Sequence, residues 1–540
     1  MPDRPGTVAA TPAGPPGGRD EATRQDLTML AKGGLLNLVG AVATGLFQFV
    51  LVLVIARGLD TGGTGAFFEA VALFLILSAA SALGADMGLS RMIPRYRALR
   101  RVHDIRRGIR IGVWPVLAVG TAAGLLVLAW APWLAGVFAG DGDSRQLEDF
   151  LRALAPFIPV YALSLVVFAA TRGFGTMRPS ALVDKVARPA LQPLLVLGVI
   201  LTGGGSTLIA LAWAGPFLPA LAAGLLWLLV LVRRAERGRA ADAEPARPVA
   251  ELVGEFWRFT GPRGLAVVFQ TTSLWLSTLL LGALRSTDEA GVYAASSRYL
   301  VAGTMLGVAV QQVMGPKLSE LLAREQRHRA ASVYQTASCW LVVLNWPIYL
   351  TLVIFGVPLL ELFGSGFTDG QVVLTILAST MLLATAVGPV DVVLLMGGRS
   401  SWNLLNTIAA LTVNLVLNLL LTPRLGLAGA ATAFAGSILL NNLLPLAQVW
   451  RFLHLHPFGE GVRVAVAIAG VCFGVLGVAV RALLGPTTAG LAVYALAGGG
   501  LYAALLWRFR DRVEVDALRG LLRSRIGRAA GRLPTHGGAR

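Results

Sequence analysis

Two long apolar runs, separated by a short break that contains glycine, constrain this chain more than any other feature. The first run extends from Leu35 to Ile55 and the second from Ala66 to Leu83. An α-helix of about 20 residues is about 30 Å long, which matches the hydrocarbon core of a bilayer. The two runs therefore predict a helical hairpin that crosses a membrane twice.

A basic segment directly after the hairpin indicates its orientation. This segment is rich in arginine from Arg91 to Arg110 and contains the pair Pro94-Arg95. Lysine and arginine are enriched in the cytoplasmic loops of membrane proteins. We therefore expect the chain to start in the cytoplasm, to cross outward through the first run, and to return through the second.

The composition of the whole chain agrees with a protein that crosses the membrane many times. Of 540 residues, 55% are hydrophobic and 14% are charged, whereas soluble domains carry about 25% charged residues. The formal net charge of +17 would suggest nucleic-acid binding in a soluble protein. Here we attribute it to loop topology and expect no nucleic-acid partner. Cys339 and Cys472 lie far apart in apolar runs, so we expect neither a disulfide framework nor a thiolate metal site.

The apolar pattern predicts an all-α, polytopic membrane protein with about fourteen transmembrane helices. The predicted spans are 35–56, 64–84, 110–133, 150–171, 187–202, 207–232, 262–283, 289–312, 333–355, 371–396, 402–422, 426–449, 462–484 and 488–507. An even number of spans puts both termini on one side of the membrane. With the N-terminus inside, most lysines and arginines fall in cytoplasmic segments, as the positive-inside rule requires.

An internal repeat divides these helices into two six-helix lobes plus two extra C-terminal helices. Arg57…Gly65-Ala66-Phe67 reappears as Arg285…Gly291-Val292-Tyr293, and a proline and a basic residue follow each copy, as Pro94-Arg95 and Pro316-Lys317. Six is an even number, so the lobes are parallel repeats related by an axis along the membrane normal. The predicted domains are a disordered cytoplasmic tail 1–30, an N-lobe 31–233, a cytoplasmic linker 234–257, a C-lobe 258–452, helices 13 and 14 in 453–509, and a basic cytoplasmic tail 510–540.

Sequence motifs for enzyme chemistry are absent. The chain has no Gly-x-x-x-x-Gly-Lys-[Ser/Thr] phosphate loop and no Gly-x-Ser-x-Gly elbow. The histidine pair His454-Leu455-His456 has no set of acids or cysteines beside it that would complete a metal site. The predicted outer loops are too short to form a catalytic domain. We expect no enzyme activity, no catalytic residue, no metal and no cofactor.

Ionisable side chains within or near the spans are the remaining candidates for function, because a charge at the centre of a membrane helix costs about 2.5–3.5 kcal/mol or more. They are Glu69, Asp86, Arg91, Arg152, Arg172, Asp184, Lys185, Arg298 and Asp391. Those near a membrane surface either snorkel to it or face a cavity. Glu69 and Arg298 lie at similar depth in corresponding helices, so they either pair with each other or Arg298 meets an anionic substrate.

Amide side chains in the second half leave two readings open. They either hydrogen-bond to neighbouring helices or bind sugar hydroxyl groups. They are Gln270, Asn345, Asn406, Asn414, Asn418, Asn441 and Asn442.

Several glycine-rich stretches together resemble one family of membrane transporters. These stretches are Gly33-Gly34-Leu35-Leu36-Asn37-Leu38-Val39-Gly40, Ala56-Arg57-Gly58-Leu59, Gly65-Ala66-Phe67-Phe68-Glu69-Ala70-Val71-Ala72-Leu73-Phe74, Leu83-Gly84-Ala85-Asp86-Met87-Gly88-Leu89, Pro94-Arg95-Tyr96 and Leu421-Thr422-Pro423-Arg424-Leu425-Gly426-Leu427-Ala428-Gly429-Ala430-Ala431. Over roughly residues 30–510 the chain resembles the Wzx-type polysaccharide exporters. They form the oligosaccharide-lipid flippase branch of the superfamily that also contains MATE drug exporters and the lipid II flippase, known as the MOP superfamily.

The resemblance implies a V-shaped pair of lobes around a cationic cavity. It implies a flippase that moves an undecaprenyl-diphosphate-linked oligosaccharide from the inner to the outer leaflet by alternating access, for polysaccharide export. A buried diphosphate needs cations, and arginine contacts phosphate in bidentate fashion. The substrate-cavity candidates are Arg91, Arg95, Arg172, Lys185 and Arg298. The candidates for coupling a proton or sodium ion are Glu69, Asp86 and Asp391.

The same resemblance places the protein in the bacterial plasma membrane, with both termini in the cytoplasm. The expected partners are a lipid-linked oligosaccharide, H⁺ or Na⁺, membrane lipids and polysaccharide-assembly proteins. Two alternatives are a MATE-like drug/ion antiporter and a lipid II flippase. A membrane-embedded polysaccharide polymerase or ligase would need a large outer loop, which the pattern does not predict.

Overall fold

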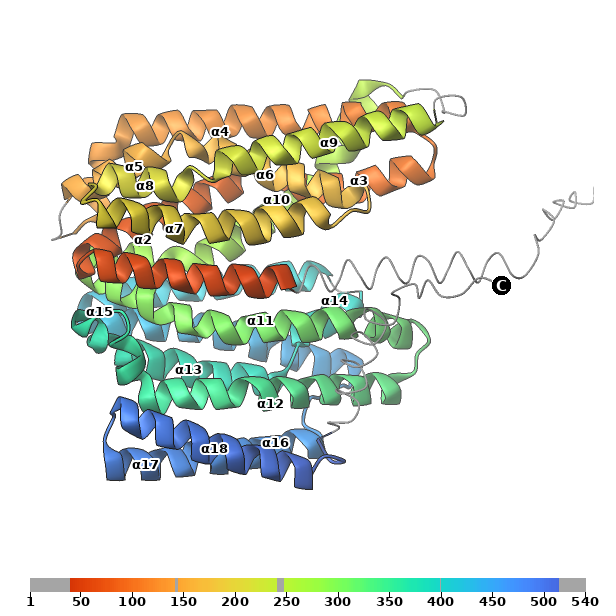
Figure 1. The fold of residues 1–540 in the computed structure, drawn as a ribbon. Helices are drawn as coiled ribbons and strands as arrows, with labels where there is room; N and C mark the ends of the chain where they lie inside the picture. The colour runs from red at the N-terminus through yellow and green to blue at the C-terminus, as the bar shows by residue number, and fades with distance from the viewer. Residues whose placement is uncertain (1–38, 141–143, 240–246, 399, 514–540) are drawn as a thin grey trace, which may run out of the picture.

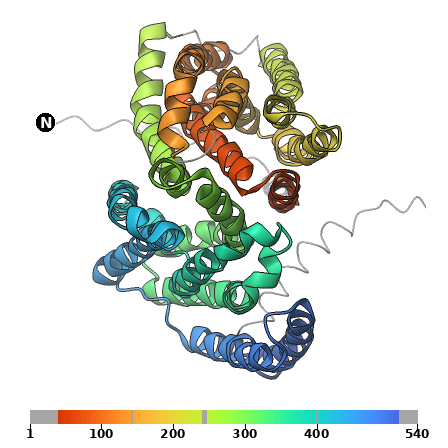
Figure 2. The same cartoon turned by 90° about the vertical axis from the view of Figure 1, so that its left-hand side faces the viewer.

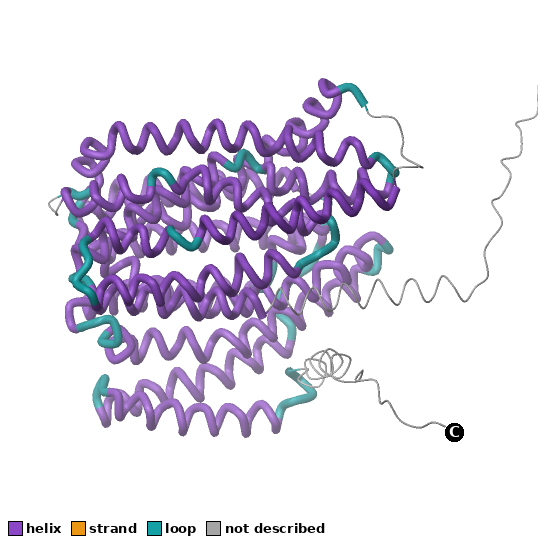
Figure 3. Tube along the Cα trace, turned by 45° about the horizontal axis from the view of Figure 1, so that its top comes forward, coloured by secondary structure: helices purple, strands orange, loops and turns teal. Residues whose placement is uncertain are grey.

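The computed structural model describes residues 39–140, 144–239, 247–398 and 400–513. Within those ranges the chain is helical and forms no β-strand (Figure 3). The helices lie side by side in one elongated bundle (Figure 1). The predicted all-α fold class is confirmed.

Among the described residues of the first half of the chain there are ten helical segments. They are Val39–Gly58, α2 (Thr61–Ser81), α3 (Ala85–Ala98), α4 (Val102–Phe138), α5 (Ser144–Leu154), α6 (Phe157–Gly173), the π-helix η1 (Ser180–Ala187), α7 (Arg188–Leu201), α8 (Ser206–Ala214) and α9 (Phe217–Arg239).

The second half continues the bundle. Its segments are α10 (Val249–Leu284), α11 (Thr287–Ala323), α12 (Arg327–Leu360), the 3-10 helix η3 (Ser365–Gly370), α13 (Gln371–Val387), α14 (Val390–Met396), α15 (Ser400–Leu453), α16 (Glu460–Ala469), the π-helix η4 (Gly470–Val475), α17 (Leu476–Leu484) and α18 (Thr488–Arg508).

Turns between the long helices lie at two opposite ends of the bundle. The turns after Gly58 and Leu284 lie at one end, on the left in Figure 1, which we name the short-loop end. The turns after Ala98 and Ala323 lie at the other end, on the right, which we name the linker end because α9 and α10 are joined there.

The predicted number of fourteen spans is not confirmed. Among the described residues, ten helices are long and apolar enough to cross a bilayer, and the α5–α6 pair, bent by 48°, would make eleven. The spans predicted at 402–422 and 426–449 both fall within α15, where the backbone leaves helical geometry at Gly426, with φ 52° and ψ −126°. Glycine adopts such a conformation without a Cβ clash. The span predicted at 187–202 is preceded by the π-helix η1.

Two groups of helices, the lobes, meet along the middle of the molecule (Figure 2) and share one hydrophobic cluster, which contains Phe67 of α2 and Tyr293 of α11. Each lobe also has a hydrophobic cluster of its own. In the N-lobe, Leu89 of α3 and Val166 of α6 share one hydrophobic cluster. In the C-lobe, Tyr334 of α12 and Val449 of α15 share another. Helices α16–α18 lie outside these lobes along α12, where Tyr494 packs on Phe355 with ring centroids 4.8 Å apart.

Helix α10 packs against both lobes. Its first half lies on the N-lobe, because Phe256 joins the cluster of Leu89 and because Gly264 meets Gly84 backbone to backbone. Its second half hydrogen-bonds to α15, where the Asn418 amide donates to Ser277 Oγ at 3.1 Å and the Asn414 amide to the Ser273 carbonyl at 3.0 Å. These two asparagines therefore serve helix packing here, and α10 connects the lobes mechanically.

Candidate functional site

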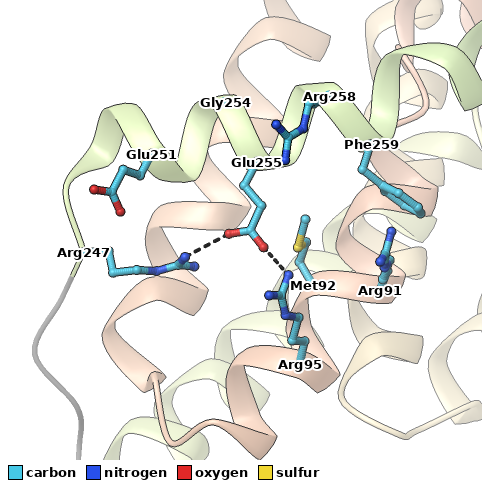
Figure 4. A pocket seen from close by; sticks show the side chains of 9 residues that line it. All are labelled: Arg91, Met92, Arg95, Arg247, Glu251, Gly254, Glu255, Arg258 and Phe259. Atoms are coloured by element: carbon cyan, nitrogen blue, oxygen red, sulfur yellow. Dashed lines mark hydrogen bonds and ion pairs between the residues drawn. The ribbon is translucent and has the colours of Figure 1, made fainter.

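A pocket of about 830 Å³ opens at the linker end between α3 and the first turns of α10 (Figure 4). Four arginines and two glutamates give its lining an excess of two positive charges. The lining residues are Arg91, Met92, Arg95, Arg247, Glu251, Gly254, Glu255, Arg258 and Phe259. A hollow with this charge suits an anion that carries more than one negative charge.

Small residues bring the two walls of the pocket together. A Cβ on Gly84 would lie 2.6 Å from the Gly264 nitrogen, and one on Gly88 would lie 2.5 Å from Thr260 Oγ1. Gly84 has φ +71°, a left-handed conformation that suits glycine. Because neither position carries a side chain, α10 lies directly on α3 and the arginines of α3 face the first turns of α10.

An ion-pair network joins the two walls. The Glu255 carboxylate pairs with Arg95 and, at 3.0 Å, with Arg247. Arg247 also contacts Asp104 of α4, with Nε to Oδ2 at 3.4 Å. The pKa of the Arg247 guanidinium is raised: partial burial lowers it, but the hydrogen bond and charge of Glu255, with the hydrogen bond of Asp104, raise it more.

Arg91 is held differently from Arg95. Its guanidinium stacks 4.1 Å above the ring of Phe259, and Arg263 lies 4.6 Å from the same ring. A stacked guanidinium keeps its N–H edge available for a phosphate or carboxylate. The sequence prediction named Arg91 and Arg95, and the structure brings both into this one pocket.

Arg172 and Lys185 lie in a second cluster, at η1. Arg172 donates a hydrogen bond to Ser180 Oγ at 3.1 Å, and it lies within electrostatic range of Asp86 and Asp184. The Lys185 carbonyl accepts a hydrogen bond from the Thr44 hydroxyl at 2.7 Å. A π-helical turn of this kind often marks a functional site.

Glu69 and Arg298 lie nearer the short-loop end. The Glu69 side chain is 1% exposed, and neither carboxylate oxygen has a hydrogen-bond partner among the described residues. It faces Gly282 of α10, where a Cβ would overlap it. The Arg298 guanidinium lies 4.3 Å above the Trp275 ring and 5.5 Å from that of Phe68. Of the two alternatives left open by the sequence, an ion pair between Glu69 and Arg298 is not formed among the described residues, because both Glu69 oxygens are without a hydrogen-bond partner.

Asp391, the last predicted candidate, lies apart from these clusters. It is half-buried in α14 at the linker end, within electrostatic range of Tyr334. Tyr334 donates its own hydroxyl to the Val387 carbonyl at 2.8 Å.

The short-loop end is sealed between the lobes. A Cβ on Gly65 of α2 would lie 2.9 Å from the Gly291 nitrogen of α11 and would overlap the Thr287 carbonyl. Thr61 donates a hydrogen bond to Asp288 across the same junction. Gly65 and Gly291 are the corresponding positions of the internal repeat, so the two copies of the motif meet each other.

Sequence reasoning missed the α10 wall of the pocket. Residues 234–257 were predicted to be a linker because they are charged, yet α10 begins at Val249. A signal was present: Leu252 and Phe256, four residues apart, form one apolar face of a helix, and Glu251 and Glu255 lie on the other side.

Comparisons with known proteins agree with this architecture. Residues 30–322 match the family described as "Polysaccharide biosynthesis protein". The chain is 24% identical over 518 residues to the stage V sporulation protein B of Bacillus subtilis, covering 90% of this chain and 96% of that protein. It is 25% identical over 212 residues to the probable low-salt glycan biosynthesis flippase Agl15 of Haloferax volcanii. That match spans 37% of this chain and less than half, 43%, of the relative.

Solved structures share the fold. The lipid II flippase MurJ in an inward closed conformation superposes with a TM-score of 0.68 at 12% identity, over 88% of this chain and 99% of MurJ. An inward-facing multidrug MATE transporter of the MOP superfamily superposes with a TM-score of 0.62 at 14% identity, over 78% and 98% of the two chains.

Proposed function

This chain belongs to the polysaccharide biosynthesis protein family, and from that premise we propose that it is a flippase. Its proposed substrate is an oligosaccharide linked through a diphosphate to undecaprenol, which it turns from the inner to the outer leaflet for polysaccharide export. The protein is proposed to lie in the bacterial plasma membrane, with the linker end and both termini in the cytoplasm. It is proposed to act as a transporter, without enzyme activity.

One observation carries the proposal: a pocket lined by Arg91 and Arg95 is open at the linker end, while glycine contacts seal the short-loop end. A diphosphate headgroup is strongly anionic and cannot enter hydrocarbon without cations. A cationic pocket at the cytoplasmic surface is where such a headgroup first needs binding. Names of relatives also support the proposal, since Agl15 and AglR of Haloferax volcanii are each described as a probable flippase.

Further cations support a path for the headgroup. Arg172 and Lys185 lie in the second cluster, and Arg298 lies nearer the sealed end. We propose that the headgroup binds first at Arg91 and Arg95, passes Arg172 and Lys185, and reaches Arg298. Separation of α2 from α11 at Gly65 and Gly291 then opens the outer side, and the lipid tail stays in the membrane throughout.

Glu69 is the proposed coupling residue. An ionised carboxylate without a partner costs several kcal/mol or more to bury, so Glu69 is neutral while the short-loop end is sealed. The Arg298 guanidinium lies 5.5 Å from the ring of Phe68, the residue before Glu69. When the seal opens, water reaches Glu69, which can then exchange its proton with the outside solution. Asp86 and Asp391 are the other coupling candidates, although Asp86 already has Arg172 within electrostatic range.

Reconstitution in proteoliposomes tests the proposal. The wild-type chain is expected to move a fluorescent undecaprenyl-diphosphate oligosaccharide between leaflets, and the double variant Arg91→Gln/Arg95→Gln to lose that activity. Arg106→Gln, which removes an arginine paired with Glu236 outside the pocket, is the control. Transport of organic cations without lipid movement would overturn the flippase proposal in favour of a drug/ion antiporter. Movement of lipid II in preference would indicate a lipid II flippase.

A further inference from the structure

Glu255 occupies an unusual position in the cationic pocket. Its carboxylate lies between two guanidinium groups, pairing with Arg95 of α3 on one side and with Arg247 on the other (Figure 4). Glu251, one turn earlier on α10, lines the same pocket but points away from Arg95 (Figure 4). Of the two glutamates in the lining, Glu255 is thus the one that lies between two of its arginines.

The two partners of Glu255 are held to different degrees. Arg247 has other anchors: its backbone N–H and its guanidinium both contact Asp104, which is buried, and Arg107 donates to its carbonyl at 3.0 Å. The Arg247 guanidinium also lies 5.7 Å from the centre of the Tyr96 ring. Arg95 is 49% exposed, and its acidic partner is Glu255. Removal of the Glu255 carboxylate therefore releases Arg95 and leaves Arg247 in place.

We propose that Glu255 stands in for a phosphate group between Arg95 and Arg247 and selects for diphosphate headgroups over monophosphate headgroups. This inference rests on the proposed flippase function. It identifies the second phosphate group as the feature of the substrate that the pocket recognises. Glu255 is a specificity-determining residue, and the ligand displaces it from Arg95.

Charge and geometry give the reason. Arg91 stacks on Phe259 and is not engaged by Glu255, so it accepts a first phosphate directly. Arg95 lies one helical turn away on the same face, and a second phosphate reaches it only by replacing the Glu255 carboxylate. A monophosphate has no second group to make this exchange. A diphosphate also supplies the two negative charges that match the excess in the lining, whereas most anionic phospholipids offer one.

Such selection has a use at the membrane surface. Anionic phospholipids surround the cytoplasmic mouth of a membrane protein and are attracted to exposed lysine and arginine. An open cluster of arginines would be filled by these lipids. With Glu255 bound between Arg95 and Arg247, a headgroup with one phosphate gains only the contact with Arg91, because reaching Arg95 would exchange one anion for another.

The alternative role for Glu255 is a brace that only holds α10 against α3. The two roles predict opposite effects of Glu255→Gln on the affinity for anions. For a brace, Glu255→Gln loosens the pocket and weakens the binding of every anion. For a stand-in, the same change frees Arg95 and strengthens binding, most of all for the monophosphate.

The test measures the affinity of the full-length chain in detergent for farnesyl diphosphate and farnesyl monophosphate, by titration at constant ionic strength. The wild type is expected to prefer the diphosphate by about tenfold or more, and Glu255→Gln to bind the monophosphate about tenfold more tightly, so that the preference falls to about threefold or less. Glu255→Asp keeps the charge, shortens the reach, and is expected to give an intermediate ratio.

Glu251→Gln is the matched control, because it removes the same charge from the same pocket without touching Arg95. It is expected to strengthen both ligands alike and to leave their ratio unchanged. An unchanged ratio in Glu255→Gln, or a loss of both affinities, overturns the inference. If the ratio changes as expected but the chain moves no lipid-linked oligosaccharide in proteoliposomes, the proposed function fails and the diphosphate selectivity stands.

Discussion

The two ends of the helix bundle are built from opposite kinds of contact. At the short-loop end, Gly65 and Gly291 bring the backbones of α2 and α11 together, and the gap has no room for a side chain. At the linker end, α3 and α10 diverge into a pocket where long charged side chains such as Arg95 and Glu255 span the space. Close backbone packing therefore holds the helices together at the short-loop end, and charged side chains link them at the linker end.

This difference indicates how each end responds to change. Backbone packing without side chains has few intermediate arrangements, so the short-loop end is either sealed or parted. Exposed ion pairs exchange partners at little energetic cost. The linker end is therefore suited to capture a charged headgroup, and the short-loop end is suited to act as a barrier. Four predictions test this contrast, from the largest expected effect to the smallest.

Gly65→Ala is expected to have the largest effect. Its Cβ would overlap the Thr287 carbonyl, and overpacking of this kind costs about 1–3 kcal/mol, which shifts the equilibrium away from the sealed state by about 5–150-fold. Lipid translocation in proteoliposomes should fall accordingly. Gly136→Ala is the matched control, because a Cβ there meets nothing within 4 Å. Equal activity of the two variants would contradict a seal based on backbone packing.

Arg95→Gln should weaken the binding of a diphosphate lipid by about tenfold, because a hydrogen bond to a charged group contributes about 1.5–3 kcal/mol. Arg91→Gln should have a similar effect, since stacking on Phe259 prepares Arg91 for the same ligand. The measurement is the dissociation constant of farnesyl diphosphate. The short-loop end should be unaffected, so sealing measured by cysteine accessibility should match the wild type. A loss of sealing in these variants would contradict the proposal that the two ends act independently.

Glu69→Gln should fold and seal like the wild type, because glutamine has the shape of the neutral carboxyl that burial favours. Translocation by the wild type should depend on the outside pH, and this dependence should be flat in the variant. Glu148→Gln, a glutamate of α5 that pairs with Arg152, is the control and should keep the wild-type dependence. If Glu69→Gln retains the pH dependence, Glu69 does not carry the coupling proton.

Arg106→Ala should have the smallest effect. Its ion pair with Glu236, at 3.0 Å, joins α4 to α9, and the Arg106 side chain is 50% exposed. Exposed pairs contribute about 0–1 kcal/mol, so the midpoint of thermal unfolding should barely move. A large shift would mean that surface charge at the linker end stabilises the lobe, which the contrast between the two ends does not predict.

Prediction from sequence succeeds here where one periodic signal decides the structure. Apolar runs such as 35–56 and 488–507 reappear as the helices Val39–Gly58 and Thr488–Arg508. It is weaker where the backbone breaks inside the membrane. At Gly84, next to Leu83 with φ 52°, the second predicted span ends and α3 continues as a separate helix. Such breaks depend on tertiary contacts, here with Gly264, which no local pattern contains.

The candidate site was predictable only in part, because some of its residues are marked by a local pattern and others are brought in by tertiary packing. Arg91 and Arg95 follow an apolar span directly, so topology alone identifies them as residues of a membrane surface. The facing residues Arg247 and Glu255 lie about 150 residues later in a charged stretch, and only the packing of α10 on α3 brings them opposite. Glu69 and Arg298 were singled out because both are ionisable residues within predicted spans. The rotation of their helices, which leaves them unpaired with each other, is not encoded in their spacing.

A reversible cross-link at the short-loop end tests alternating access most directly. Thr61 and Asp288 touch across the lobes, and the native Cys339 and Cys472 are buried, so Thr61→Cys/Asp288→Cys should form a disulfide on oxidation. The oxidised protein should still bind farnesyl diphosphate at the linker end, should translocate no lipid-linked oligosaccharide, and should recover translocation after reduction. Undiminished translocation by the fully cross-linked protein would contradict the claim that the lobes must part there.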